Sequence, residues 1–118
     1  MSLRNIFQVE READTLVLTA LVNLSELEYD ETVTQEVYEL LTDETITNLV
    51  LDFHKTDYFG STALGFFVRL WKKTQMRGGR MAFCHVSPHE LEILHITRLD
   101  EFWTICSSRA EALQVVKA

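Results

Sequence analysis

Short apolar segments rich in β-branched residues alternate with longer segments of helical periodicity along this chain. A short continuous run of apolar and β-branched residues is typical of a strand, whereas a helix repeats its apolar residues every third or fourth position, so the two patterns separate the elements. Residues 48–53 are typical of a buried strand, and residues 30–41 carry their apolar side chains on one helical stripe. Strands are predicted at residues 7–10, 15–22, 48–53, 80–85 and 102–106, and helices at residues 30–41, 60–76, 88–97 and after Ser107 or Ser108.

The predicted order of elements is β-β-α-β-α-β-α-β-α. Strands that alternate with helices are joined by right-handed crossovers and pair in parallel, whereas the first two strands form a hairpin at one mixed edge. We therefore predict an α/β fold with a mixed, mostly parallel sheet of about five strands and four α-helices. With 118 residues, one proline and no internal repeat, the chain is expected to form a single domain over residues 1–118.

The charge balance argues against two classes of partner. The chain has 11 Lys and Arg residues against 18 Asp and Glu residues, a formal net charge of −7. Nucleic acids and anionic membranes both attract clustered positive charge, so neither is expected as the main partner. No apolar run is long enough to span a membrane and no signal-peptide pattern opens the chain, so no membrane insertion is expected. Two cysteines, Cys84 and Cys106, suit the reducing cytoplasm.

The charges are distributed unevenly. Eleven of the 18 acidic residues precede residue 45, and residues 69–80 contain five basic residues and no acid. Four of these basic residues lie along one side of the predicted helix at 60–76: Arg69, Lys72, Lys73 and Arg77. They form either an ordinary solvated helix face or a surface that steers an acidic partner.

The segment between the strand at 48–53 and the following helix is the most informative for function. In an open α/β sheet, sites form at the carboxyl ends of strands, where this helix begins at Gly60-Ser61-Thr62. Ser61 or Thr62 either caps the helix with its hydroxyl or carries a phosphate, which the unpaired N–H groups of a helix start favour. The spacing alone leaves both interpretations open.

Leu-Asp-Phe at 51–53, followed after seven residues by Ser-Thr-Ala-Leu-Gly at 61–65, resembles the STAS domain, the family of bacterial anti-sigma factor antagonists. Four weaker similarities follow the family's order, and together they extend over about residues 6–117. They lie at residues 25–28, 78–85, 94–102 and 107–113. The resemblance implies a STAS-like fold and a protein that works by binding.

The resemblance also implies roles for single residues. The phospho-acceptor of the family is the second hydroxyl of the pair, which is Thr62, with Ser61 as the second choice. Gly60 stands where the family has an acidic residue that contributes to partner binding or phosphorylation, and Arg98 stands where it often has glycine. The partner-binding residues are expected at the start of this helix and in neighbouring loops: Glu28, Phe59, Gly60, Ala63, Phe66 and Arg69.

The helix at 60–76 carries apolar residues on two stripes. Leu64, Phe67, Val68 and Trp71 are expected to face the core. A second stripe with Ala63, Phe66 and Leu70 is either buried as well or partly exposed as a docking surface.

Metal binding and catalysis are not expected. Cys84, His85, His89 and His95 do not have the spacing of a recognised zinc site. No nucleophile–histidine order stands out and no glycine-rich phosphate loop is present, so we expect no cofactor and no enzymatic activity.

The resemblance implies a regulatory function. The unmodified protein would bind an anti-sigma factor or serine-threonine switch kinase, and phosphorylation from ATP at the start of the second helix would release that partner. Two alternatives stay open: an unphosphorylated scaffold subunit of a stressosome-like or ABC lipid-transport complex, and a STAS module that senses a small ligand. Homodimer formation also stays open.

Overall fold

The computed structural model describes residues 3–24 and 31–117. Five strands form one sheet in the order β1-β2-β3-β4-β5, in which β1 and β2 are antiparallel and all other neighbours are parallel. The strands are β1 (Phe7–Glu12), β2 (Thr15–Ala20), β3 (Asn48–Asp52), β4 (Met81–Cys84) and β5 (Thr104–Cys106). The helices are α1 (Leu3–Ile6), α2 (Glu31–Leu40), α3 (Ser61–Met76), α4 (Pro88–Ile96), the 3-10 turn η1 (Leu99–Glu101) and α5 (Arg109–Lys117).

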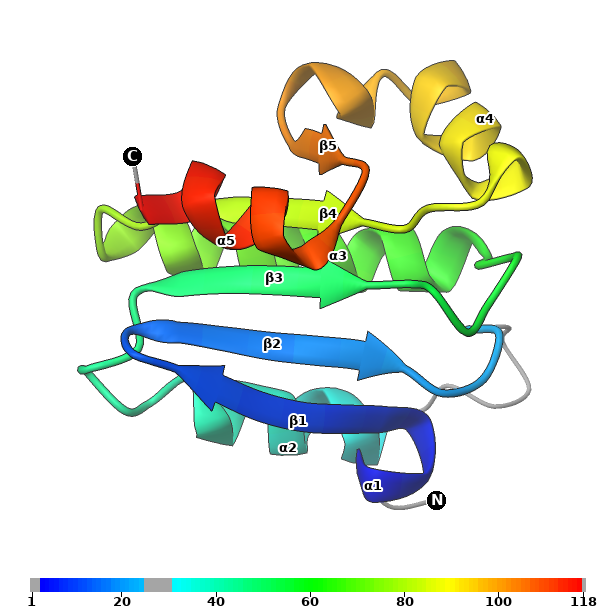
Figure 1. Ribbon diagram of the computed structural model, residues 1–118. Helices are drawn as coiled ribbons and strands as arrows, with labels where there is room; N and C mark the ends of the chain where they lie inside the picture. Colours follow the sequence, from blue (N-terminus) through cyan, green and yellow to red (C-terminus); the bar gives the residue numbers. More distant parts are fainter. Residues whose placement is uncertain (1–2, 25–30, 118) are drawn as a thin grey trace.

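The helices cover the two faces of the sheet unequally (Figure 1). Helices α2 and α3 lie behind the sheet, α5 crosses the opposite face, and α4 lies beyond the end of β4. In the part of the chain that is described, no helix is both long and apolar enough to cross a membrane.

The predicted fold class and the order of the main elements are confirmed. Two short elements were not predicted, α1 at the start of the chain and η1 before the last strand. Because η1 occupies residues 99–101, β5 begins at Thr104 and not at residue 102 as predicted.

Both faces of the central strands are buried, which explains their nearly continuous apolar sequence. The larger core lies between the sheet, α2 and α3, and it is rich in aromatic rings. Phe83 stacks on Phe53 and on Trp103, with ring centroids 5.6 and 5.0 Å apart. A smaller core of Val, Ala and Cys side chains lies under α5.

Arg109 at the start of α5 joins that helix to the sheet. Its guanidinium is 3.1 Å from Oδ2 of Asp52 and 3.0 Å from Oε1 of Glu10, and it donates to Oγ1 of Thr19 at 2.8 Å. Burial by itself raises the pKa of Asp52, but hydrogen bonds from His54, His85 and Arg109 outweigh it and lower the pKa to about 2. Asp52 is therefore a buried, ionised carboxylate at the end of β3.

Candidate functional site

The loop at residues 53–60 connects β3 to α3 and is anchored at its inner end. The Phe59 side chain is buried, and its ring centroid lies 5.3 Å from that of Phe53 and 5.3 Å from that of Phe67. The backbone N–H of Gly60 donates to the carbonyl of Leu24 at 2.9 Å, beside a parallel bridge between Leu24 and Phe59. The start of α3 therefore has a fixed position relative to the sheet.

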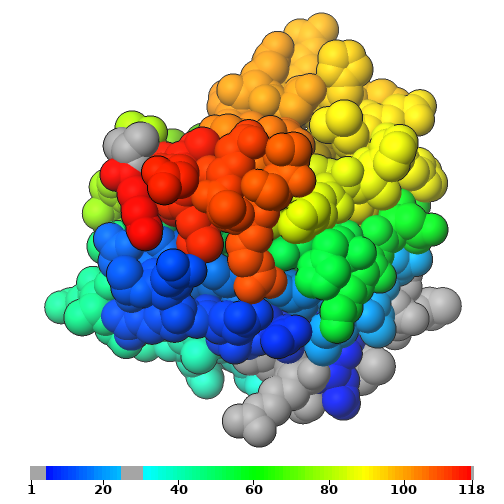
Figure 2. Space-filling model, in the orientation of Figure 1, coloured from blue at the N-terminus to red at the C-terminus, as the bar shows by residue number. Residues whose placement is uncertain are grey.

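The outer part of the loop is held by side chains from distant segments. Asn23 forms two hydrogen bonds with Asp57, from its amide to the carboxylate at 2.9 Å and from the Asp57 N–H to its oxygen at 3.1 Å. The Ser87 hydroxyl donates to the carbonyl of Asp57 at 2.8 Å. In Figure 2, the green surface of this region lies between the blue hairpin and the yellow segment around α4.

Glu90 connects the loop to α4. Its carboxylate accepts from the Thr56 hydroxyl at 2.7 Å and from the backbone N–H of Ser87 at 2.9 Å, and Ser87 in turn caps α4. The predicted capping box at residues 87–90 is thereby confirmed. Glu90 is fully buried, and burial raises its pKa above the ordinary 4.5 despite the hydrogen bonds from Ser87 and Thr56.

The variant Glu90→Gln is expected to remove a pH dependence of stability. Because the pKa of Glu90 is raised on folding, the folded protein keeps this proton to a higher pH than the unfolded chain. The stabilising contribution is therefore complete below pH 4.5 and falls as pH rises through the raised pKa. Urea unfolding at several pH values should show wild type losing stability relative to Glu90→Gln over this window. A constant difference between the two proteins would contradict the assignment.

Ser61 and Thr62 are the first two residues of α3, and both are exposed. The N-cap is Gly60, which has no side chain, so neither Ser61 nor Thr62 occupies the N-cap position and the interpretation of one of them as the N-cap is wrong. The helix start presents backbone N–H groups and the positive end of the helix dipole beside the two hydroxyls, which favours an anion at this position.

The structure corrects three of the predicted docking residues. Phe59, Ala63 and Phe66 have no exposed surface, so a partner cannot contact their side chains in this conformation. The stripe with Ala63, Phe66 and Leu70 is fully buried. On the other stripe Phe67 is buried as predicted, but Leu64, Val68 and Trp71 are only partly buried. The helix is therefore rotated relative to the sequence expectation. Gly60 and Arg69 reach the surface, and Glu28 lies outside the described residues.

Half of the predicted basic stripe has structural roles. The Arg77 guanidinium donates to the carbonyls of Asp43 at 3.0 Å and Ile46 at 2.7 Å. It thus ties the end of α3 to the loop between α2 and β3. The Lys73 ammonium lies 4.7 Å from the centre of the Tyr38 ring. Arg69 and Lys72 are exposed, with Arg69 two turns beyond Thr62.

Sequence reasoning missed residues that the fold brings to the same edge of the sheet. Asp57 and Tyr58 are exposed in the loop before α3, and the Tyr58 ring lies 5.3 Å from that of His89. Asp52, His54 and His85 also converge there. The signal was present, because polar residues lie at or just beyond the ends of two buried strands that pair in parallel.

Comparisons with known proteins agree with this geometry. The profile of the STAS domain matches residues 10–112. No curated protein sequence matches the chain significantly.

Solved structures share the fold over nearly the whole chain. A STAS domain protein from Planctomyces limnophilus, described as an anti-sigma factor antagonist, is 27% identical with a TM-score of 0.84, over 95% of this chain and 98% of that one. A candidate anti-sigma factor antagonist from Thermotoga maritima is 20% identical with a TM-score of 0.87, over 98% of both chains. The phosphorylated form of the Bacillus cell fate determinant SpoIIAA is 17% identical with a TM-score of 0.72, over 93% of this chain and 98% of that one. The chain belongs to the STAS domain family.

Proposed function

We propose that the protein is a phosphorylation-controlled antagonist of an anti-sigma factor in the cytoplasm. In its unmodified form it binds an anti-sigma factor or serine-threonine switch kinase through the surface around the start of α3. Phosphorylation of Thr62, with Ser61 as the second choice, releases that partner. The observation that carries this proposal is the exposure of both residues, Ser61 and Thr62, in the first turn of α3 in a STAS fold.

A phosphate at this position is compatible with the fold. The loop before α3 is anchored by Phe59, Asp57 and Thr56, none of which has to move to expose the hydroxyls. The helix dipole and the backbone N–H groups of the first turn stabilise added negative charge. A phosphate adds about −1.5 to −2 charges at neutral pH, which changes the surface without changing the core. Phosphorylation of SpoIIAA, which shares this fold, supports such a switch.

The proposed docking surface consists of exposed positions only. On α3 these are Ser61, Thr62, Gly65 and Arg69, and in the preceding loop Tyr58 is exposed. Gly65 lets a partner's backbone approach the helix closely, and Arg69 offers a cation to an acidic partner. A phosphate on Thr62 or Ser61 would lie within this surface, two turns before Arg69.

The variant Thr62→Glu tests the switch, and Thr32→Glu is its matched control. Thr32 is the exposed second residue of α2, as Thr62 is the exposed second residue of α3, so the two variants add the same charge at equivalent helix positions. Binding of the candidate switch kinase, measured by calorimetry, is expected to weaken at least about tenfold in Thr62→Glu. The added carboxylate would face an acidic partner, and two negative charges that meet in an interface repel each other. Thr32→Glu should bind as wild type does. Equal binding by all three proteins would contradict the proposal.

The modification itself is tested by incubating the protein with that kinase and ATP. Mass spectrometry should find phosphate on wild type and Ser61→Ala and a loss of phosphate in Thr62→Ala. Phosphate that persists in Thr62→Ala and disappears in Ser61→Ala would move the site to the second choice. Unchanged phosphorylation in a variant that lacks both hydroxyls would overturn the assignment.

One observation favours the alternative of an unphosphorylated scaffold subunit. Gly60 lacks the carboxylate that the family resemblance expects directly before the hydroxyl pair. The backbone itself accommodates aspartate, since φ is −96° and an added Cβ would be 3.7 Å from its nearest neighbours. If the kinase modifies Gly60→Asp but not wild type, the natural protein is the unmodified scaffold.

A further inference from the structure

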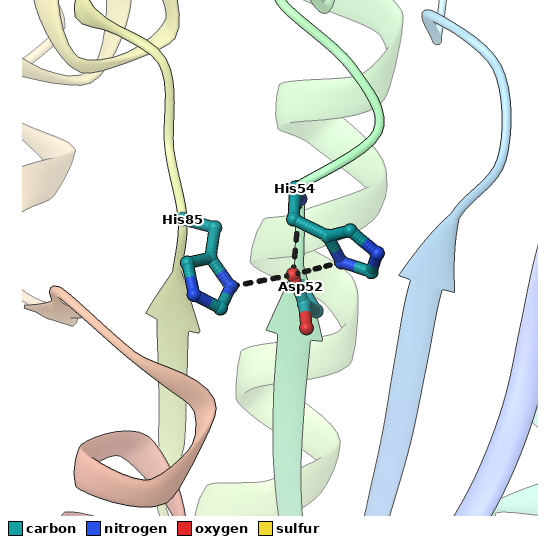
Figure 3. Close-up of side chains that lie close together, drawn as sticks. All are labelled: Asp52, His54 and His85. Atoms are coloured by element: carbon teal, nitrogen blue, oxygen red, sulfur yellow. Dashed lines mark hydrogen bonds and ion pairs between the residues drawn. The ribbon is translucent and has the colours of Figure 1, made fainter.

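The Asp52 carboxylate gathers two imidazole rings at the end of β3 (Figure 3). Nδ1 of His54 lies 2.9 Å from Oδ1 of Asp52, and Nδ1 of His85 lies 3.0 Å from the same oxygen. The two rings meet edge to face, with centroids 5.8 Å apart. One ligand atom from each of the three residues thus lies within 4.8 Å of the other two.

The fold holds these three side chains in place. β3 and β4 are parallel neighbours with Asp52 opposite Cys84, so His54 and His85, which follow shortly after the two strand ends, emerge at the same edge of the sheet. The backbone N–H of His54 also donates to Oδ1 of Asp52 at 3.0 Å. His85 has a left-handed backbone with φ of 57°, a conformation that is costly for a residue other than glycine. The convergence therefore depends on the pairing of β3 with β4 and on the turn that follows each strand.

We infer that Asp52, His54 and His85 form a binding site for a divalent transition-metal ion such as Zn²⁺. Two imidazole nitrogens and one carboxylate oxygen are a common ligand set for such ions. Bonds of about 2.0–2.1 Å in a tetrahedral site separate neighbouring ligand atoms by roughly 3.3 Å. The two separations from Oδ1 of Asp52, 2.9 and 3.0 Å, differ from this value by a few tenths of an ångström, and the two histidine ligand atoms lie within 4.8 Å of each other. Binding therefore requires the two exposed rings to turn toward a shared ion, while Asp52 stays in place.

Metal coordination changes the tautomer of each ring but not its charge. Each Nδ1 that now lies beside Oδ1 has to lose its hydrogen to become a ligand, and the neutral ring then carries the hydrogen on Nε2. The side chain of His54 is 43% exposed and that of His85 is 37% exposed, so solvent reaches both rings. This exposure gives the ion access and leaves a fourth position for water or for a group from a partner.

The charges around Asp52 suit a bound cation. Its second oxygen, Oδ2, is held by Arg109, which also pairs with Glu10. These three groups carry two negative charges and one positive charge, so the network that extends from buried Asp52 to the surface has a net charge of −1 when both imidazoles are neutral. Arg109 also fixes the carboxylate so that Oδ1 faces the two rings, as outer-shell partners do in metal sites.

This ligand set differs from the cysteine and three histidines whose spacing in the sequence did not fit a zinc site. His85 is shared, but Cys84 lies in the buried core under α5. His89 lies against Tyr58, and Nδ1 of His95 pairs with Asp100 at 3.1 Å on the exposed side of α4. His54 and His85 are 31 positions apart and follow two adjacent strands. No local spacing rule for zinc covers such a separation.

The inference is tested by titrating the full chain with Zn²⁺ in a calorimeter. The protein is first treated with a chelator, and the titration is done near neutral pH. His54→Ala and His85→Ala are each expected to weaken Zn²⁺ binding at least about tenfold, because each removes one of three ligands. His95→Ala is the matched control, since it removes another imidazole that pairs with a carboxylate, and it should leave the affinity unchanged. Both site histidines are well exposed, so these variants should fold, which circular dichroism checks.

A second measurement uses the fold's stability as the readout. Zn²⁺ should raise the melting temperature of wild type and of His95→Ala, and it should leave that of the double variant His54→Ala/His85→Ala unchanged. The inference is overturned if wild type binds no Zn²⁺, or if His95→Ala weakens binding as much as the site variants do. Neither result depends on partner binding or on phosphorylation of Thr62.

Discussion

Replacing Phe66 by alanine is expected to lower the free energy of unfolding by about 3–5 kcal/mol, because the change leaves a cavity in a well-packed core. The Phe66 side chain is 0% exposed. Its ring centroid lies 6.2 Å from that of Phe7, 6.0 Å from that of Tyr38 and 6.1 Å from that of Phe67. These contacts join β1, α2 and α3, so the loss should affect the packing of both helices on the sheet.

Arg69→Ala is the matched control, because Arg69 lies on the same helix three residues further on and is exposed. It should change the free energy of unfolding by no more than about 0.5 kcal/mol, as surface substitutions usually do. Urea unfolding followed by circular dichroism measures both variants. The opposite pattern, in which Phe66→Ala weakens partner binding and leaves stability unchanged, would restore Phe66 to the docking surface and contradict the structure.

The fold could be predicted because its signals are local. Three local signals mark places where the structure begins or ends an element. They are the apolar run at residues 48–53, the Gly78-Gly79 pair and the capping box at residues 87–90. The alternation of strands and helices then leaves few topologies. The short turn η1 escaped prediction, since three residues carry no periodic pattern.

The candidate site could be predicted only in part, because the orientation of a helix depends on its neighbours. Helix α3 is apolar on two stripes, and only its packing against the sheet shows that Phe66 faces the core while Val68 lies near the surface. The position of Ser61 and Thr62 at the helix start followed from local sequence. The meeting of Asp52 with His85 depends on the register of β3 against β4, which periodicity alone does not determine.

Arg98 shows a further limit of local reasoning. Its backbone is left-handed, with φ of 62°, which fits the glycine that the family resemblance suggested at this position. Sequence periodicity gave no indication of this conformation. The resemblance therefore located a constrained turn that propensity alone would have missed.

The variant Gly79→Ala is expected to lower the free energy of unfolding by about 3 kcal/mol, the upper range for overpacking. A Cβ at this position would overlap the carbonyl oxygen of Thr47 and lie 2.6 Å from its carbonyl carbon. The backbone cannot easily move away, because Gly79 N–H donates to the carbonyl of Thr74 at 2.8 Å and Arg80 N–H donates to Oδ1 of Asn48 at 2.9 Å. Thr47 is held from the other side, since its N–H donates to the carbonyl of Asp14 at 2.9 Å.

Gly65→Ala is the control, and it should have the opposite sign. Gly65 is exposed inside α3, and the nearest atom to an added Cβ is an Arg69 nitrogen at 3.8 Å. Alanine there should raise the free energy of unfolding by about 0.5–1 kcal/mol, because it lowers the entropy of the unfolded chain and favours the helix. Both variants are measured by urea unfolding. If Gly79→Ala were as stable as Gly65→Ala, the close approach of residue 79 to Thr47 would be wrong, and Gly79 would serve only to end the helix.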